Sequence, residues 1–201
     1  MFLCLIGAIL NIFLNKACAA LDIPLYLDTV LTVTVTLAGG LVWGSLCGAL
    51  TNIVNHTILF WGWEGYLFAL CNIATAVITW FFKRSFPAEL RLIRGNKQMD
   101  RVIVLLLLSF ALCIVMSVLG GLLTALILGI DPALIGEDGL MAKLGATLHG
   151  YGFPLFLVEI LSRIPVNIID RLITVFGGYG IALAAAAYYR KVQSGYVRRK
   201  A

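Results

Sequence analysis

The chain is a succession of long apolar runs that are separated by short polar segments. Runs without a formal charge cover residues 29–63, 65–82, 102–130 and 172–189, and a further apolar stretch covers 2–20. A helix crosses the hydrocarbon core of a bilayer with about 20 residues, so each run predicts at least one membrane-spanning helix. The run 29–63 would be about 52 Å long as one helix, and Gly39-Gly40 is its natural break. The pattern therefore predicts an all-α integral membrane protein in which one domain, residues 1–201, is a bundle of six transmembrane helices.

Composition supports this class. Of 201 residues, 61% are hydrophobic and only 12% are charged, against about a quarter charged in soluble domains. The cysteines lie far apart in apolar runs, which favours small core residues over a disulfide framework or a zinc site. Residues 1–20 could also be a cleaved signal peptide, but the stretch before Asn11 carries no basic residue, which disfavours that alternative.

The basic residues predict the orientation of the chain. Eleven of the fifteen lysines and arginines lie in the connection 83–101 and in the C-terminal tail from Arg190 onwards. Basic segments beside membrane spans tend to stay in the cytoplasm. With six spans, this bias predicts a multi-pass protein of the cell membrane with both termini cytoplasmic. The net charge of +5 is then explained by topology, so no nucleic-acid partner is expected.

The fifth and sixth spans are joined by a long outer connection, residues 129–164. Leucines repeat along 140–148, and Glu159 and Arg163 are spaced i,i+4 in the segment that follows. These patterns predict two short interfacial helices over the outer mouth. In an alternative reading, residues 140–162 form a seventh span, which would place the basic tail outside.

The second helix is predicted to be short, from Pro24 to Gly39, because proline is favoured at the first helical position. Asp28 would then lie about one turn inside this helix, in a recess that opens to the outside. Ionisable groups inside a membrane usually face a cavity, a partner or a pathway. Other polar residues are expected at a similar depth, and the predicted ligand-binding residues are Asp28, Asn55, Glu64, Tyr66, Asn72, His149, Asn167 and Asp170. A salt bridge between Arg171 and Asp28 or Asp170 is the simpler explanation of these charges.

Two segments resemble a known family of membrane proteins. The stretch "PLYLDTVLTVTVTLAGGLVWGSLCGALTNI" (24–53) is similar to the second and third helices of the substrate-binding S components of energy-coupling factor (ECF) vitamin transporters. The stretch "IPVNIIDRLITVFGGYGI" (164–181) is similar to their sixth helix. The resemblance implies a high-affinity subunit that captures a vitamin or related micronutrient outside the cell. It also implies two kinds of partner: a coupling transmembrane protein and two cytoplasmic ATPases.

In that family, small residues on the first helix pack against the coupling protein. The corresponding region here is "LIGAILNIF", where Gly7 and Ala8 are small but Asn11 interrupts the spacing. Gly7 and Ala8 are therefore the predicted coupling interface. A second stripe of small residues, Gly40, Gly44 and Gly48, is expected to serve close helix packing inside the bundle instead.

Three carboxylates around one recess, Asp28, Glu64 and Asp170, would favour a neutral or cationic heterocycle as the ligand. A thiamin-, pyrimidine- or pyridoxine-like compound fits this electrostatic argument. The sequence has no P-loop and no hydrolase motif, so an enzyme is not expected, and neither a cofactor nor a metal site is predicted. A sensor domain related to the five-helix input regions of histidine kinases and an ion-coupled carrier are the alternative functions.

Overall fold

The structure is a computed structural model, and it describes residues 2–59, 64–93, 98–130 and 140–198. These residues are arranged as helices and short connections. The helices are α1 (Phe2–Ala20), α2 (Val30–Gly39), α3 (Leu41–Leu59), α4 (Glu64–Leu67), α5 (Ala69–Ser85), α6 (Gln98–Ile130), α7 (Leu140–Gly150) and α8 (Leu155–Arg198). The all-helical class predicted from the apolar runs is confirmed for this part of the chain.

Four stretches of the described chain are helical, long and apolar enough to cross a membrane. They are Phe2–Ala20, Gly65–Ser85, Gln98–Gly129 and Leu155–Ser194, and α2 is a shorter apolar helix. These helices are compatible with a multi-pass membrane protein. The count of six spans stays a prediction, because it requires α2 and α3 to cross as well.

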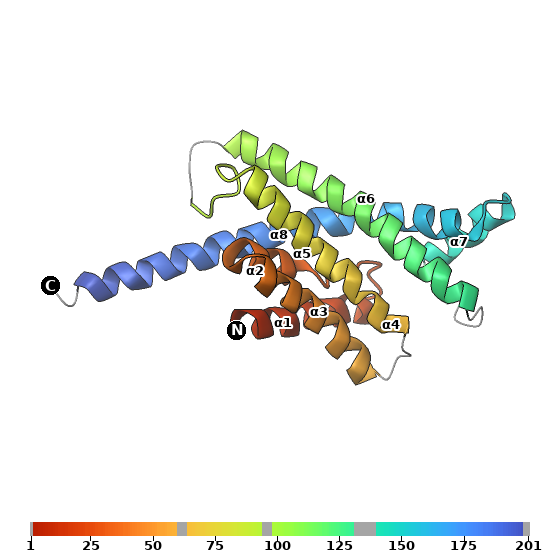
Figure 1. Ribbon diagram of the computed structural model, residues 1–201, viewed down its shortest axis with the longest axis horizontal. Helices are drawn as coiled ribbons and strands as arrows, with labels where there is room; N and C mark the ends of the chain where they lie inside the picture. The colour runs from red at the N-terminus through yellow and green to blue at the C-terminus, as the bar shows by residue number, and fades with distance from the viewer. Residues whose placement is uncertain (1, 60–63, 94–97, 131–139, 199–201) are drawn as a thin grey trace.

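The short helix α2 lies at the centre of the bundle, in contact with α1, α3, α5 and α8 (Figure 1). Every residue from Thr29 to Leu37 is buried, threonines included. Val33 and Leu37 join a core with Leu108 of α6 and Val175 of α8. An apolar helix surrounded in this way presents no side to lipid, so its packing depends wholly on its neighbours.

Glycine determines both the end of α2 and how closely its neighbours approach. The predicted break at Gly39-Gly40 is confirmed, and Gly40 has φ +90°, a left-handed conformation that favours glycine. A Cβ on Gly48 would lie 2.8 Å from the Asn72 carbonyl oxygen, and one on Gly44 would collide with Thr36. Gly44 and Gly48 thus serve helix packing inside the bundle, as expected.

Two predicted helix boundaries are wrong. The second helix begins at Val30 and not at Pro24, because Leu27 has φ +44°, which a right-handed helix does not accommodate. The segment after Tyr151 is not a separate interfacial helix: α8 runs without a break from Leu155 through Pro165. Helices inside membranes tolerate proline when neighbours satisfy the freed backbone groups. The other outer helix, over residues 140–150, is present as α7.

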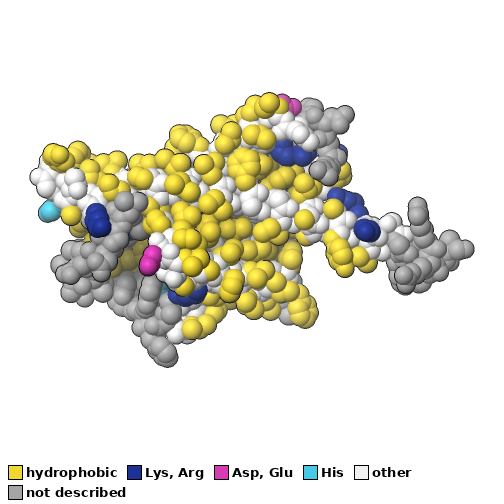
Figure 2. Space-filling view, turned by 180° about the vertical axis from the view of Figure 1, so that it is seen from behind, with side chains coloured by type: hydrophobic (Ala, Val, Ile, Leu, Met, Phe, Trp, Pro, Cys, Tyr) yellow, Lys and Arg dark blue, Asp and Glu magenta, His cyan; other side chains and the backbone are white. Residues whose placement is uncertain are grey.

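The outer surface of the bundle is broadly apolar. On α6, exposed apolar side chains recur along the whole helix from Val102 to Leu126. Figure 2 shows hydrophobic side chains covering most of the visible face, with two groups of basic side chains beside the base of the projecting C-terminal part of α8. This surface is suited to lipid contact along the helices.

Candidate ligand-binding site

The irregular segment between α1 and α2, residues 21–29, is held by Asp170 of α8. The Asp170 carboxylate accepts hydrogen bonds from the backbone N–H groups of Tyr26 (2.8 Å) and Leu27 (2.9 Å) through the same oxygen, Oδ1. Leu27 has φ +44°, a conformation that is uncommon for a leucine. A side chain 143 positions away in sequence from Leu27 therefore fixes the backbone just before α2.

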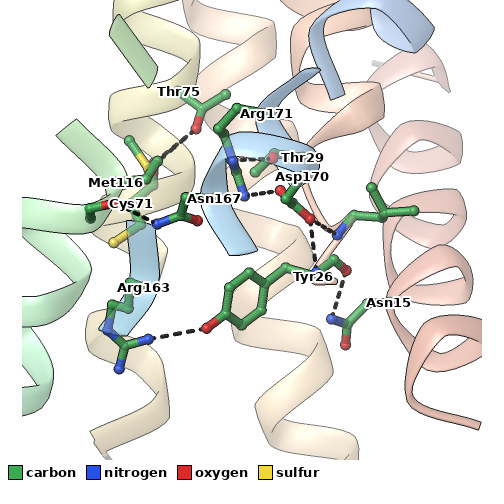
Figure 3. Close-up of polar contacts among 12 residues, drawn as sticks. Asn15, Tyr26, Thr29, Cys71, Thr75, Met116, Arg163, Asn167, Asp170 and Arg171 are labelled. Carbon is green, nitrogen blue, oxygen red and sulfur yellow. Dashed lines mark hydrogen bonds and ion pairs between the residues drawn. The ribbon is translucent and has the colours of Figure 1, made fainter. Parts of the chain in front are cut away.

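Asp170 also forms an ion pair with its neighbour Arg171 through Oδ2. Both residues are buried, with exposures of 0% for Asp170 and 3% for Arg171. The Arg171 guanidinium donates a second hydrogen bond to the hydroxyl of Thr29, 2.8 Å away, at the start of α2 (Figure 3). The pair thus joins α8 to both sides of the point where α2 begins. The salt bridge that the sequence suggested between Asp170 and Arg171 is confirmed.

Asp28 lies next to this ion pair. Its carboxylate lies near Asn72 of α5 and near Arg171 and Asp170. The Arg171 guanidinium is paired with Asp170, and Asp28 is a second carboxylate in its surroundings. Asp28 is half-buried, whereas Asp170 is fully enclosed, so Asp28 is the more accessible of the two acids.

Tyr26 connects the ion pair to a second arginine. Its backbone carbonyl accepts a hydrogen bond from Asn15 of α1 (2.9 Å), and its phenol oxygen accepts one from Arg163 (3.1 Å). Arg163 also donates to Thr124 of α6 (2.6 Å) and forms a salt bridge with Glu159 one turn earlier in α8 (3.4 Å). The cluster thus contains two guanidinium groups, one on each side of the Tyr26 backbone and ring (Figure 3).

The side of the cluster that faces α5 and α6 is less charged. Asn167 of α8 donates to the Ser117 hydroxyl of α6 (2.9 Å), and Thr75 of α5 contacts the sulfur of Met116 (3.7 Å). Figure 3 shows Cys71 in the same region, close to Asn167. Amide, hydroxyl and sulfur groups of this kind suit an uncharged, polarisable ring.

The structure brings together half of the predicted ligand-binding residues. Asp28, Asn72 and Asp170 lie around Arg171, and Asn167 is one helical turn away on α8. Asn55 reaches the cluster indirectly, because it donates to Asn15 (3.3 Å), which in turn bonds Tyr26.

Two predicted residues, Tyr66 and His149, are not part of this cluster. Tyr66 is exposed and hydrogen-bonded to Thr57 (3.1 Å), and its ring lies edge-on to His56. His149 is exposed on α7. Glu64 begins α4, but its side chain lies outside the described part of the structure.

The predicted coupling residues Gly7 and Ala8 are buried in the bundle. A Cβ on Gly7 would lie 2.9 Å from the Cys47 sulfur of α3, and Ala8 is 4% exposed. Asn11, on the same face of α1, donates to the hydroxyls of Thr32 and Thr51 and accepts the N–H of Leu31. This face of α1 therefore holds α2 and α3, and the interruption of the small-residue spacing by Asn11 has a packing role.

Sequence reasoning missed Tyr26 and Arg163 as members of the site and gave Arg171 only a bridging role. Both arginines lie in a long, mainly apolar helix, so the rule that singled out Asp28 and Asp170 applied equally to them. Tyr26 carried no comparable signal, since its role depends on its backbone groups as much as on its phenol.

In the described chain, this cluster gathers polar groups of the kind that line small-molecule sites. Its charged groups are already joined to one another, and its amides and hydroxyls are donors and acceptors for a polar ring. No protein-family model, curated protein or solved structure matches the chain. The functional argument therefore rests on the residues of this cluster.

Proposed function

We propose that the chain is a substrate-binding S component of an ECF-type transporter: a membrane-embedded subunit that captures a vitamin or related micronutrient outside the cell for ATP-driven uptake. One observation carries the proposal. Four ionisable side chains, those of Asp28, Arg163, Asp170 and Arg171, converge around the start of the central helix α2. Such groups are expensive inside a membrane and usually serve a ligand, a partner or a pathway.

The charge balance supports a neutral or cationic ligand. Arg171 is paired with Asp170, and the second guanidinium, Arg163, is paired with Glu159. Among these five side chains, three are acidic and two are basic. A ligand with one positive charge, such as a thiamin- or pyridoxine-like heterocycle, would balance the excess carboxylate at Asp28.

The topology belongs to the same proposal. Six crossings would be made by α1, α2, α3, α5, α6 and α8, with the binding cluster near the outer surface and both termini in the cytoplasm. Helix α2 has 10 residues, about 15 Å, so the irregular segment before it must complete the crossing. A coupling protein would meet α1 on its exposed face, which carries Ile9 and Phe13, because Gly7 and Ala8 pack inside.

A second candidate, an ion-coupled carrier, is favoured by the shape of α2. In many carriers, broken helices place a helix end beside charged groups near the middle of the membrane. The start of α2 at Val30 lies beside Asp28 and Asp170 in a similar way. The two candidates differ in whether the protein alone can concentrate its ligand.

Reconstitution distinguishes them. The purified protein is placed in liposomes, and mass spectrometry identifies small molecules that copurify with it; thiamin and pyridoxine serve as labelled probes. An S component binds its ligand and does not concentrate it without ATPase subunits. Concentrative uptake that is driven by an ion gradient alone would contradict the proposal and establish the carrier.

The ligand contact is tested with Asp28→Asn. If Asp28 bonds a charged ligand group, the variant loses about 1.5–3 kcal/mol of binding free energy while its thermal stability changes little. Asp22→Asn is the matched control: it is the same substitution on an exposed residue of the same connection. Unchanged affinity together with a lower melting temperature for Asp28→Asn would make Asp28 a structural residue.

A further inference from the structure

An open hollow lies at the other end of α2, away from the ligand-binding cluster. It has a volume of about 190 Å³ and is lined by Gly40, Trp80, Lys83 and Arg84. Gly40 is the turn between α2 and α3, and the other three residues belong to the last turns of α5. A Cβ placed on Gly40 would meet no atom within 4 Å, so the glycine side of the hollow is open.

Both charged residues of the lining are basic, and both are held in place. The Lys83 ammonium donates to the Leu37 carbonyl of α2 (2.6 Å), which uses one of its three N–H groups. The Arg84 guanidinium lies over the Trp80 ring, 5.6 Å from its centroid. Because the contact to Leu37 offsets the negative end of α2, Arg84 is the stronger attraction for an anion, and Lys83 adds its two remaining N–H groups.

Exposed apolar side chains adjoin the lining residues in sequence, and we take them as the rim of the hollow. Val42 and Trp43, just after Gly40, are exposed, and so is Phe81, which follows Trp80. A free anion would gain nothing from these side chains. A molecule with an anionic head and hydrocarbon tails could use both features, with its head at the cations and its tails along the rim.

The position of the hollow is consistent with the inner leaflet. Lys83 and Arg84 begin the basic connection 83–101, which the distribution of positive charge assigns to the cytoplasmic side. Basic pockets between membrane helices on that side are suited to acidic lipid head groups.

We propose that this hollow binds the phosphate head group of an anionic phospholipid, with Arg84 and Lys83 contacting the phosphate and Trp80 at the level of the glycerol. The site goes beyond ligand capture and does not depend on it. It would fix the cytoplasmic end of α2 against α5 through a lipid.

Native mass spectrometry of the purified full chain in detergent tests the proposal. The protein is incubated with equal amounts of dioleoyl phosphatidylglycerol and dioleoyl phosphatidylcholine, and the ratio of the two bound lipids is measured. We expect phosphatidylglycerol to be preferred, and Arg84→Gln to lower that preference about fivefold. Arg84→Lys, which keeps the charge, should retain most of it.

Arg91→Gln is the matched control, because Arg91 is an exposed arginine of the same connection that does not line the hollow. If Arg91→Gln lowers the preference as much as Arg84→Gln, the attraction is spread over the whole basic surface and the proposed site is wrong. Equal retention of the two lipids by the parent protein would also overturn it. Displacement of phosphatidylglycerol by inorganic phosphate would show a site for free anions and contradict a lipid site.

Discussion

The N-terminal and C-terminal ends of α2 are stabilised by different interactions. At its N-terminal end, the backbone before the helix is bound by the carboxylate of Asp170, and Arg171 bonds the hydroxyl of Thr29. At its other end, the chain turns within one residue at Gly40, and Lys83 of α5 donates to the Leu37 carbonyl. The N-terminal end therefore depends on a buried ion pair that is distant in sequence. The C-terminal end depends on a local glycine turn and on one lysine.

The two ends differ in whether charged side chains are buried there, which costs free energy. A glycine turn is enough to end the helix on the Gly40 side, where the chain leaves α2. The N-terminal end instead places an aspartate–arginine pair at 0% and 3% exposure, which stabilises a fold poorly compared with apolar packing of the same volume. A buried ion pair beside the half-buried Asp28 fits the proposed binding site, and it makes this end the more sensitive to substitution.

The largest effect is expected for Asp170→Asn. This change leaves Arg171 charged and buried, and it weakens the acceptor of two backbone N–H groups. Breaking a buried pair on one side costs about 3–5 kcal/mol, so folded yield and melting temperature in detergent should fall sharply.

The double variant Asp170→Asn/Arg171→Gln is the control for that prediction. It removes both charges, so it should recover part of the stability that Asp170→Asn loses. A single variant as stable as the parent protein would show that the N-terminal end does not depend on the ion pair, and the contrast between the two ends of α2 would disappear.

The same contrast separates what the sequence could predict from what it could not. The Gly39-Gly40 break and the helix over 140–150 follow from local rules of glycine and apolar spacing, and both were predicted. The start of α2 at Val30 was not, because it depends on hydrogen bonds between Tyr26 and Leu27 and a residue more than 140 positions later. These hydrogen-bonding partners are too far apart in sequence for a local pattern to reveal them.

Part of the candidate site was predictable for a related reason. Asp28 and Asp170 are acids in apolar surroundings, and their depth could be counted along the helices. The position of Tyr66 and His149 away from the cluster depends on how α4 and α7 turn, which local patterns do not determine. The connection before the last span was expected to continue to residue 164, yet α8 begins at Leu155 and passes through Pro165, in contact with α2, α6 and α7.

A smaller effect is expected at the other end of α2 for Lys83→Met. The variant loses one charge-assisted hydrogen bond to Leu37 and the favourable interaction of a cation with a helix C-terminus. We expect a loss of about 1–2 kcal/mol in unfolding free energy, well below that of Asp170→Asn. Lys143→Met, an exposed lysine of α7, is the control and should be neutral. A loss as large as that at Asp170 would mean that both ends are closed by equally costly charges.

The smallest effect is expected where α1 ends and the connection to α2 begins. Ile23 N–H bonds to the Cys18 carbonyl (3.0 Å) and Asp22 N–H to that of Ala19 (3.3 Å), which is the hydrogen-bond pattern of a Schellman motif. Asp22 occupies its left-handed position, with φ +51°. Glycine is favoured there, and Asp22 is exposed, so Asp22→Gly should raise the unfolding free energy by about 0.5–1 kcal/mol, measured as a small rise in melting temperature.

Asp22→Ala is the comparison: it removes the same carboxylate but keeps a Cβ, and it should not stabilise. If both variants raise the melting temperature equally, the gain comes from removing a charge, and the backbone of this connection carries no strain at Asp22.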